Sequence, residues 1–81
     1  MTRIDPAFVM EILDLGGIVT SARWQSRDMI CPYCDSGKRV RYHVILRIAE
    51  SRLPDGLRSS RFVCSKDCVR SWVIRSTLEV P

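Results

Sequence analysis

The stretch MICPYCDSG, residues 29–37, decides how the rest of the chain is interpreted. It contains Cys31 and Cys34 in a C-x2-C arrangement, and a second pair, Cys64 and Cys68, follows after an interval of 29 residues. Two cysteines this close in sequence serve either as a redox-active dithiol or as two ligands of one metal ion. The residues around each pair therefore have to distinguish thiol chemistry from metal binding.

The tetrapeptide CPYC at residues 31–34 resembles the active-site motif of glutaredoxins. In that family the motif opens a helix, whose N-terminus lowers the pKa of the first thiol. Here the next residues, DSGKRVRYHVIL, form a glycine-containing turn and an alternating strand pattern instead. The later prolines, Pro54 and Pro81, also lie outside the setting that a glutaredoxin fold requires. A thiol–disulfide oxidoreductase is therefore only the third interpretation of the chain.

Taken together, the two cysteine pairs favour metal binding. Two close pairs separated by a hairpin-sized segment suit four-coordinate Zn²⁺, and soft thiolate ligands favour zinc, whereas iron–sulfur proteins usually show other spacings. The second pair follows a predicted strand and enters the first turn of a predicted helix, where the helix dipole favours thiolate. We therefore predict one structural Zn²⁺, with two disulfides as the alternative. The expected ligands are Cys31, Cys34, Cys64 and Cys68.

A chain this short gains stability from a structural metal ion. Its 81 residues form one domain at most, and at this size apolar burial barely offsets conformational entropy. The N-terminus lacks the pattern of a secretory signal, and no run approaches the ~20 apolar residues of a membrane span. We expect an intracellular protein, in cytoplasm or nucleus, with no membrane partner. In a reducing compartment, paired cysteines bind metal more often than they form structural bridges.

The N-terminal part of the sequence predicts a helix and a short strand. Asp5 is a suitable N-cap with Pro6 at the first helical position, and Gly16 and Gly17 end the helix. Phe8, Ile12 and Leu15 recur on one face of this helix, 5–15. Residues 18–24, IVTSARW, contain β-branched residues in rough alternation and are predicted to form a strand.

The remainder predicts a hairpin and a second helix. The clearest strand runs from Lys38 to Ile48, because its residues alternate between apolar and basic. PDG at 54–56 predicts a turn, and RSSRFVC, residues 58–64, predicts the returning strand. Ser65 is a suitable N-cap for a helix over 66–78. We expect Val40, Tyr42, Val44, Leu46 and Ile48 to share the buried side of the first strand, and Trp24 and Trp72 to lie in the core, with His43 on the surface.

The order of these elements predicts the fold. A turn with two cysteines, a β-hairpin and a helix carrying the second pair is the arrangement of a treble-clef zinc finger. The predicted fold class is thus a small α+β domain, a zinc-stabilised treble clef with an added N-terminal helix and short strand. We expect a single zinc-binding domain over 1–81, made of an extension, 1–24, and the zinc finger, 25–81.

The segment RFVCSKDCVRSW, residues 61–72, adds a family resemblance. It is similar to the F-C-S-x-x-C signature of the TRASH, MYM-type and related FCS-type fingers. It also resembles the small bacterial gyrase-inhibitor zinc proteins, which pair C-P-x-C with a later C-S-x-x-C. The resemblance covers Cys31 to about Trp72, although the 29-residue interval is longer than is usual there and residues 1–24 have no counterpart. It implies a binding module for proteins, in some cases within transcription or DNA-associated complexes.

The residues favour a binding role over catalysis. The chain shows no Ser–His–acid set and no glycine-rich phosphate loop, and four thiolates would leave zinc no open coordination position. We therefore expect a non-enzymatic adaptor or regulator that docks on a larger protein complex, with transcription regulation or DNA-binding machinery as the implied setting.

The distribution of charge suggests where a partner binds. The net charge is +4, and residues 31–81 hold ten basic and five acidic residues, a net charge of +5. Arginine makes forked contacts with carboxylate and phosphate alike, so direct nucleic-acid binding through the arginine-rich strand face is the alternative function. The apolar side of the N-terminal helix is a candidate surface for self-association. The predicted partner-binding residues are Arg39, Arg41, Arg47, Arg61 and Arg70.

Overall fold

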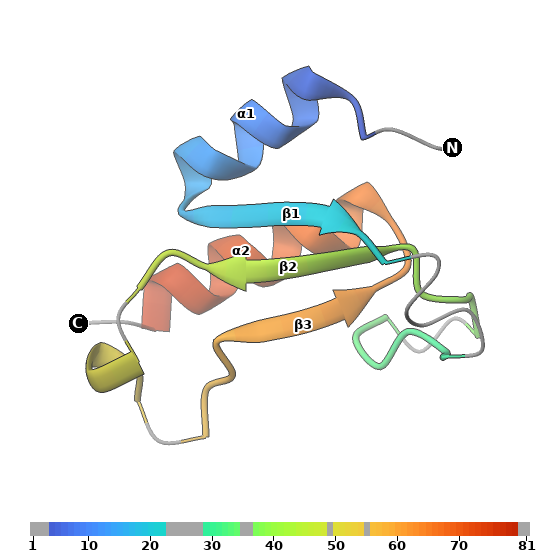
Figure 1. Cartoon of the computed structure of the whole chain (residues 1–81). Helices are drawn as coiled ribbons and strands as arrows, with labels where there is room; N and C mark the ends of the chain where they lie inside the picture. Colours follow the sequence, from blue (N-terminus) through green and yellow to red (C-terminus); the bar gives the residue numbers. More distant parts are fainter. Residues whose placement is uncertain (1–3, 23–28, 35–36, 49, 55, 80–81) are drawn as a thin grey trace.

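The computed structural model describes residues 4–22, 29–34, 37–48, 50–54 and 56–79. Within these ranges the chain forms a small α+β structure in which two helices accompany a three-stranded antiparallel sheet (Figure 1). The elements in order are α1 (Pro6–Leu15), β1 (Gly17–Ser21), β2 (Tyr42–Leu46), the short 3-10 helix η1 (Glu50–Arg52), β3 (Ser60–Val63) and α2 (Lys66–Glu79). None of the described helices is long and apolar enough to cross a membrane.

Local signals determine both ends of α1, as predicted. The Asp5 carboxylate accepts a hydrogen bond from the Ala7 backbone N–H at 3.0 Å, and Gly16 ends the helix in the left-handed conformation with φ of 105°. Gly17, expected to share in this ending, instead begins β1. A Cβ at Gly17 would lie 3.0 Å from Val73 and 3.1 Å from Ile12. The absence of a side chain at Gly17 therefore lets β1 approach both helices.

The sheet has the order β1-β2-β3, with β2 in the centre. Gly17 of β1 lies opposite Leu46 of β2, and Tyr42 of β2 lies opposite Val63 of β3. The strand predicted at 18–24 is thus present as Gly17–Ser21, whereas Arg23 and Trp24 fall outside the described residues. The connection from β2 to β3 includes the predicted turn, closed by a 3.1 Å hydrogen bond from the Leu57 N–H to the Pro54 carbonyl.

The strand β2 is shorter than the predicted strand from Lys38 to Ile48. The alternation itself continues, since Val40 is buried along with Val44 and Leu46. However, residues 38–40 pair with the segment around Cys31: the Val40 N–H donates to the Met29 carbonyl at 2.9 Å. β2 therefore begins only at Tyr42, because the backbone before it pairs with a different segment. Tyr42 and Ile48 are half-buried rather than fully buried.

The core lies between the sheet and α2, which covers one face (Figure 1). Trp72 is buried, which confirms its predicted place in the core, and Cys68 and Ser76 on the same side of α2 are buried with it. Val69 and Val73 beside them are fully buried, as are Val44 and Val63 of the sheet. None of the described helices covers the opposite face of the sheet, which we call the uncovered face. Its strand residues are Ile18, Thr20, His43, Ile45, Ser60 and Phe62.

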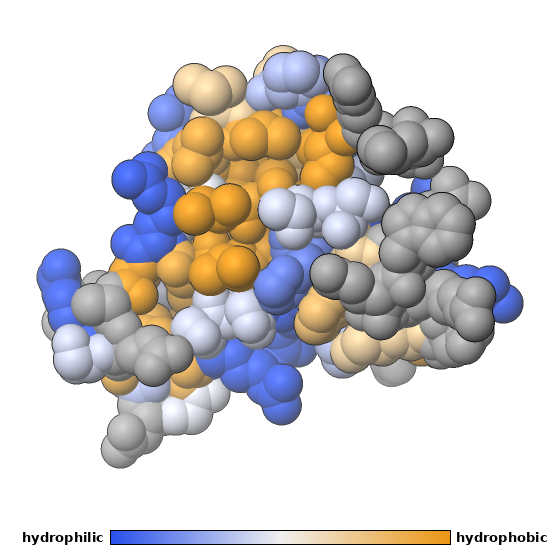
Figure 2. Space-filling view, viewed as in Figure 1, coloured by the Kyte–Doolittle hydropathy of each residue, from blue (hydrophilic) through white to orange (hydrophobic). Residues whose placement is uncertain are grey.

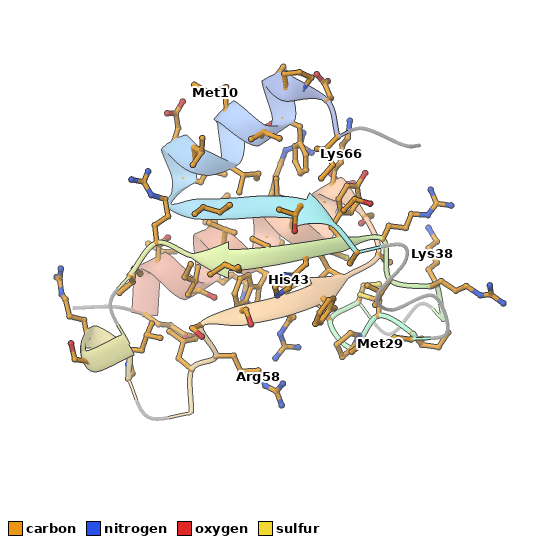
Figure 3. The ribbon with its side chains drawn as sticks, in the orientation of Figure 1. Met10, Met29, Lys38, His43, Arg58 and Lys66 are labelled. Atoms are coloured by element: carbon orange, nitrogen blue, oxygen red, sulfur yellow. The ribbon has the colours of Figure 1, made fainter. Side chains whose placement is uncertain are left out.

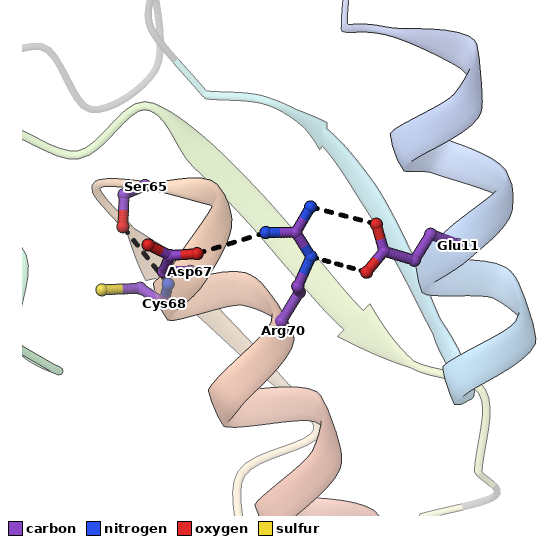
Figure 4. Close-up of polar contacts among 5 residues, drawn as sticks. All are labelled: Glu11, Ser65, Asp67, Cys68 and Arg70. Atoms are coloured by element: carbon purple, nitrogen blue, oxygen red, sulfur yellow. Dashed lines mark hydrogen bonds and ion pairs between the residues drawn. The ribbon is translucent and has the colours of Figure 1, made fainter.

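An ion pair and a buried aromatic ring join α1 to α2. The Arg70 guanidinium donates to both carboxylate oxygens of Glu11, at 2.5 and 3.0 Å, and also to Asp67 at 3.2 Å (Figure 4). The hydrogen bond from Arg70 holds the pKa of Glu11 below its usual value. Phe8 and Ile12 of α1 are buried in the chain's own core, so an intermolecular contact through α1 would have to use its exposed Met10.

Two adjacent residues of β2 provide a test of the faces of the sheet. Val44 is fully buried, whereas Ile45 on the uncovered face is 38% exposed. Val44→Asp places an unpaired charge in the core, and we expect it to lower the free energy of unfolding by about 3–5 kcal/mol. Ile45→Asp, the matched control, should shift the thermal midpoint by only a few degrees. Equal destabilisation by both substitutions, measured by thermal denaturation, would contradict the assignment of the two faces.

Candidate metal centre

The four cysteines, distant in sequence, converge at one end of the sheet. Their Sγ atoms all lie within 4.8 Å of one another, and all four thiols are free of disulfides. Cys31 and Cys34 bracket a turn, Cys64 directly follows β3, and Cys68 lies in the first turn of α2. The two predicted pairs therefore form a single cluster that could hold one metal ion.

The dimensions of the cluster fit one tetrahedral ion. Zinc–sulfur bonds of about 2.3 Å separate the sulfurs of a tetrahedral site by about 3.8 Å. The Sγ atoms of Cys64 and Cys68 are 3.8 Å apart, and those of Cys34 and Cys64 are 3.4 Å apart. Within the described part of the chain, this cluster contains only cysteines and not His43. Its donor set is thus four soft sulfur atoms, which suits a closed structural site.

Backbone hydrogen bonds bring the two pairs together. The Cys31 N–H donates to the Lys38 carbonyl at 2.9 Å, which folds the first pair back toward β2. The Arg41 N–H donates to the Val63 carbonyl at 2.9 Å, which holds the end of β3 beside the start of β2. Ser65 then begins α2, since its Oγ accepts from the Cys68 N–H at 3.2 Å (Figure 4). The predicted N-cap thereby also places the fourth thiol.

Without a cation the cluster disfavours thiolates. Burial, and then hydrogen bonding with the neighbouring thiols, raises the pKa of Cys64 to about 12. Burial likewise raises the pKa of Cys68, although the hydrogen bond from Ser65 opposes this change. Three of the sulfurs are almost completely buried and only Cys34 is exposed. A bound divalent cation would supply the positive charge that four clustered thiolates require, three of them on buried residues, so the chemistry of this donor set fits a metal ion.

Tyr33, between the first two cysteines, connects their turn to α2. Its hydroxyl lies 2.7 Å from the Ser71 Oγ and accepts a hydrogen bond from the Arg75 guanidinium at 3.3 Å. None of these residues was predicted to belong to the site. The only available signal was that Ser71 and Arg75 are four residues apart and so share a face of the helix. Together they anchor the Cys31–Cys34 turn to the helix that carries Cys68.

The structure distributes the five predicted partner-binding arginines over different surfaces. Arg39, Arg41 and Arg47 are exposed. Arg61 lies opposite Val44 in the register, on the side of α2, and its Nε is buried without a hydrogen-bond partner among the described residues. Arg70 is held by Glu11 and Asp67. Of the five, only these first three are exposed, with Arg39 beside Ile30, Arg41 directly before β2 and Arg47 directly after it.

His43 differs from the expected surface histidine. It is half-buried, and its ring stacks on that of Phe62 with centroids 4.4 Å apart. Its partner lies directly opposite on β3, so this stacking is a cross-strand contact. The sequence showed the alternation that places His43 on the arginine side, but not which aromatic residue would lie across from it.

Removal of the metal should unfold the protein. Structural zinc contributes an apparent binding free energy of about 10–16 kcal/mol in small fingers, coupled to folding. We expect native mass spectrometry to find one Zn²⁺ per chain, and a chelator or Cys64→Ser to abolish the cooperative thermal transition. Metal-free protein recovered from a chelator-free preparation, still folded by circular dichroism, would contradict this prediction.

Loss of the Tyr33 hydroxyl should weaken retention of the metal while leaving the fold intact. Tyr33→Phe removes hydrogen bonds worth about 1 kcal/mol, so transfer of zinc to a competing chelator should accelerate by about fivefold. Tyr42→Phe is the matched control, since Tyr42 packs edge-on against Phe8 instead, with ring centroids 5.9 Å apart. Equal transfer rates in the two variants would show that the Tyr33 contacts do not anchor the turn.

Comparisons of the chain with protein-family models, with curated proteins and with solved structures yield no match. The proposed function therefore rests on the geometry of the cysteine cluster and of the surfaces around it.

Proposed function

We propose that this chain is a non-enzymatic binding module, a treble-clef zinc finger in which one structural Zn²⁺ joins the two cysteine pairs. The observation that carries the proposal is the single cluster of four thiols, with all Sγ atoms within 4.8 Å. The order of elements supports it, because a cysteine-bracketed turn, the β2–β3 hairpin and α2 follow one another as in that fold. The resemblance of residues 61–72 to FCS-type fingers points in the same direction.

The same geometry argues against catalysis. Zinc with four thiolate ligands has no open position for water or substrate. A dithiol mechanism would need a helix directly after Cys31 to activate the thiol, whereas residues 32–34 form a turn and residues 38–40 pair as extended backbone. Zinc catalysis and dithiol redox chemistry are thereby both disfavoured. The proposed role of the chain is therefore recognition of another molecule.

The surface supports docking on a protein. Figure 2 shows a continuous apolar area that extends from α1 over part of the uncovered face, bordered by hydrophilic atoms. Met10, Ile18 and Ile45 are the exposed large apolar residues of these elements. Apolar areas of this kind, rimmed by polar groups, mark protein interaction sites. The proposed role is thus an adaptor or regulator on a larger protein complex, and the family resemblance suggests transcription or DNA-associated machinery.

Charge reversal beside this surface tests the proposal. The double variant Arg39→Glu with Arg41→Glu should retain zinc and the thermal midpoint, because exposed charges contribute little to stability. It should reduce recovery of the partner complex in a pull-down by about tenfold, through loss of steering and forked contacts. Arg52→Glu with Lys66→Glu, an equal change of charge at exposed positions outside the uncovered face, is the control.

The salt dependence of the same pull-down distinguishes the two partner classes. The affinity of a partner that docks on an apolar surface should fall only modestly between 50 and 200 mM salt. The affinity of a nucleic acid held through several phosphates should fall by about 10³-fold or more. A steep loss, together with recovery of nucleic acid, would replace the adaptor role with direct nucleic-acid binding. Equal recovery with both double variants would remove Arg39 and Arg41 from the interface.

A further inference from the structure

We propose that the uncovered face of the sheet receives an amphipathic helix of a partner protein whose apolar stripe is flanked by carboxylates. This inference rests on the proposed function as a protein-binding module and names the chemistry of its partner. Three features of the face carry it: a pair of exposed isoleucines on β1 and β2, a width that matches one helix, and flanking arginines with no acidic residue among the described strand residues of the face.

The pairing register arranges the side chains of the face in rows. Ile18 of β1 lies opposite Ile45 of β2, and these residues are 42% and 38% exposed. In the next row Thr20 lies opposite His43, which stacks on Phe62 of β3. Figure 3 labels His43 in this row and Met10 on α1 above β1. An aliphatic row thus adjoins an aromatic pair on a face that the described residues leave open.

The dimensions of the face suit a helix. Three strands about 4.8 Å apart give a face about 10 Å wide between the outer strands, close to the 10–12 Å diameter of a helix with its side chains. The other face of the same sheet is already covered by a single helix, α2, of 14 residues. A second helix of similar length on the uncovered face would complete a three-layer arrangement and remove Ile18 and Ile45 from water.

The charges of the face specify the partner. Arg41 and Arg47, both exposed, flank β2 at positions that share the side of His43 and Ile45 by alternation. The strand residues of this face that the structure describes include no Asp or Glu. A second copy of the chain would therefore bring like charges together, whereas carboxylates beside an apolar stripe would pair with both arginines. The aliphatic row also favours a protein over nucleic acid, since isoleucine offers bases no aromatic stacking surface.

The test begins with unbiased selection. A library of random 16-residue peptides displayed on phage is panned on the zinc-loaded full chain. We expect enriched sequences to carry apolar residues at i, i+3 or i+4 and i+7, together with net negative charge. A synthetic peptide from the enriched set should gain helicity on binding, as measured by circular dichroism.

Two pairs of variants then locate the site. Ile45→Asp should weaken binding of this peptide by about tenfold or more, as for a central interface residue. Ile74→Asp on α2, which is 42% exposed and belongs to the helix on the other side of the sheet, should leave affinity unchanged. Arg41→Gln with Arg47→Gln should weaken binding about tenfold at low salt, and less at high salt. Zinc content and thermal midpoint verify that each variant is folded.

The contrary outcomes separate this inference from the proposed function. Enrichment of neutral or basic peptides, or acidic peptides that bind Ile45→Asp as well as the parent, would overturn the acidic helix but retain protein binding. A dimer in sedimentation that Ile45→Asp dissociates would assign the face to a second copy. If no peptide is enriched while a single-stranded oligonucleotide binds, both the inference and the adaptor role fail.

Discussion

The structure depends on bringing four thiols, from two segments far apart in the chain, into one mostly buried cluster. Cys31 and Cys34 precede β2, whereas Cys64 and Cys68 follow β3, so the whole hairpin lies between them. Crowded and buried, these thiols resist ionisation, as the raised pKa of Cys64 shows. A metal ion reverses this preference because its charge stabilises every thiolate at once. If the cluster binds a metal ion, metal binding and folding are therefore coupled.

The helix α2 couples this cluster to the apolar core. Its first turn carries Cys68, and the following turns bury Val69, Trp72 and Val73 against the sheet. Arg70 on the same helix holds α1 through Glu11, and Ser71 and Arg75 contact Tyr33 in the cysteine turn. One helix therefore contacts β2, α1 and the cysteine turn. A chain this small has little other apolar surface to bury, so a change at the cluster propagates to the whole structure.

The two faces of the sheet have different tasks. Val44 and Val63 on one face are buried against α2. Ile18 and Ile45 on the other face are exposed to water. Leaving aliphatic side chains exposed costs the hydrophobic stabilisation that their burial would provide. A partner that covers this face, as proposed above, would recover that stabilisation. The residues that stabilise the core and those proposed to bind a partner are then adjacent in sequence but on opposite faces of the sheet.

Sequence alone determined the features that depend on neighbours within a few positions. The N-cap at Asp5, the end of α1 at Gly16, the cap at Ser65 and the buried side of α2 follow from local hydrogen bonding and helical spacing, and each was predictable. The spacing of the cysteines was sufficient to nominate all four members of the cluster. Alternation along residues 38–48 likewise separated Val44 from the arginine side.

Tertiary structure decided whatever depends on residues remote in sequence. The role of Gly17 follows from the closeness of Val73, and β2 begins only after residues 38–40, which pair with the segment around Cys31. The contact of Tyr33 with Ser71, the pairing of Arg70 with Glu11 and the inward position of Arg61 have the same origin. No local pattern encodes these contacts, because they arise only when segments distant in sequence pack together. The physical reason is that spacing specifies which side of an element a residue occupies, whereas packing alone specifies what lies against it.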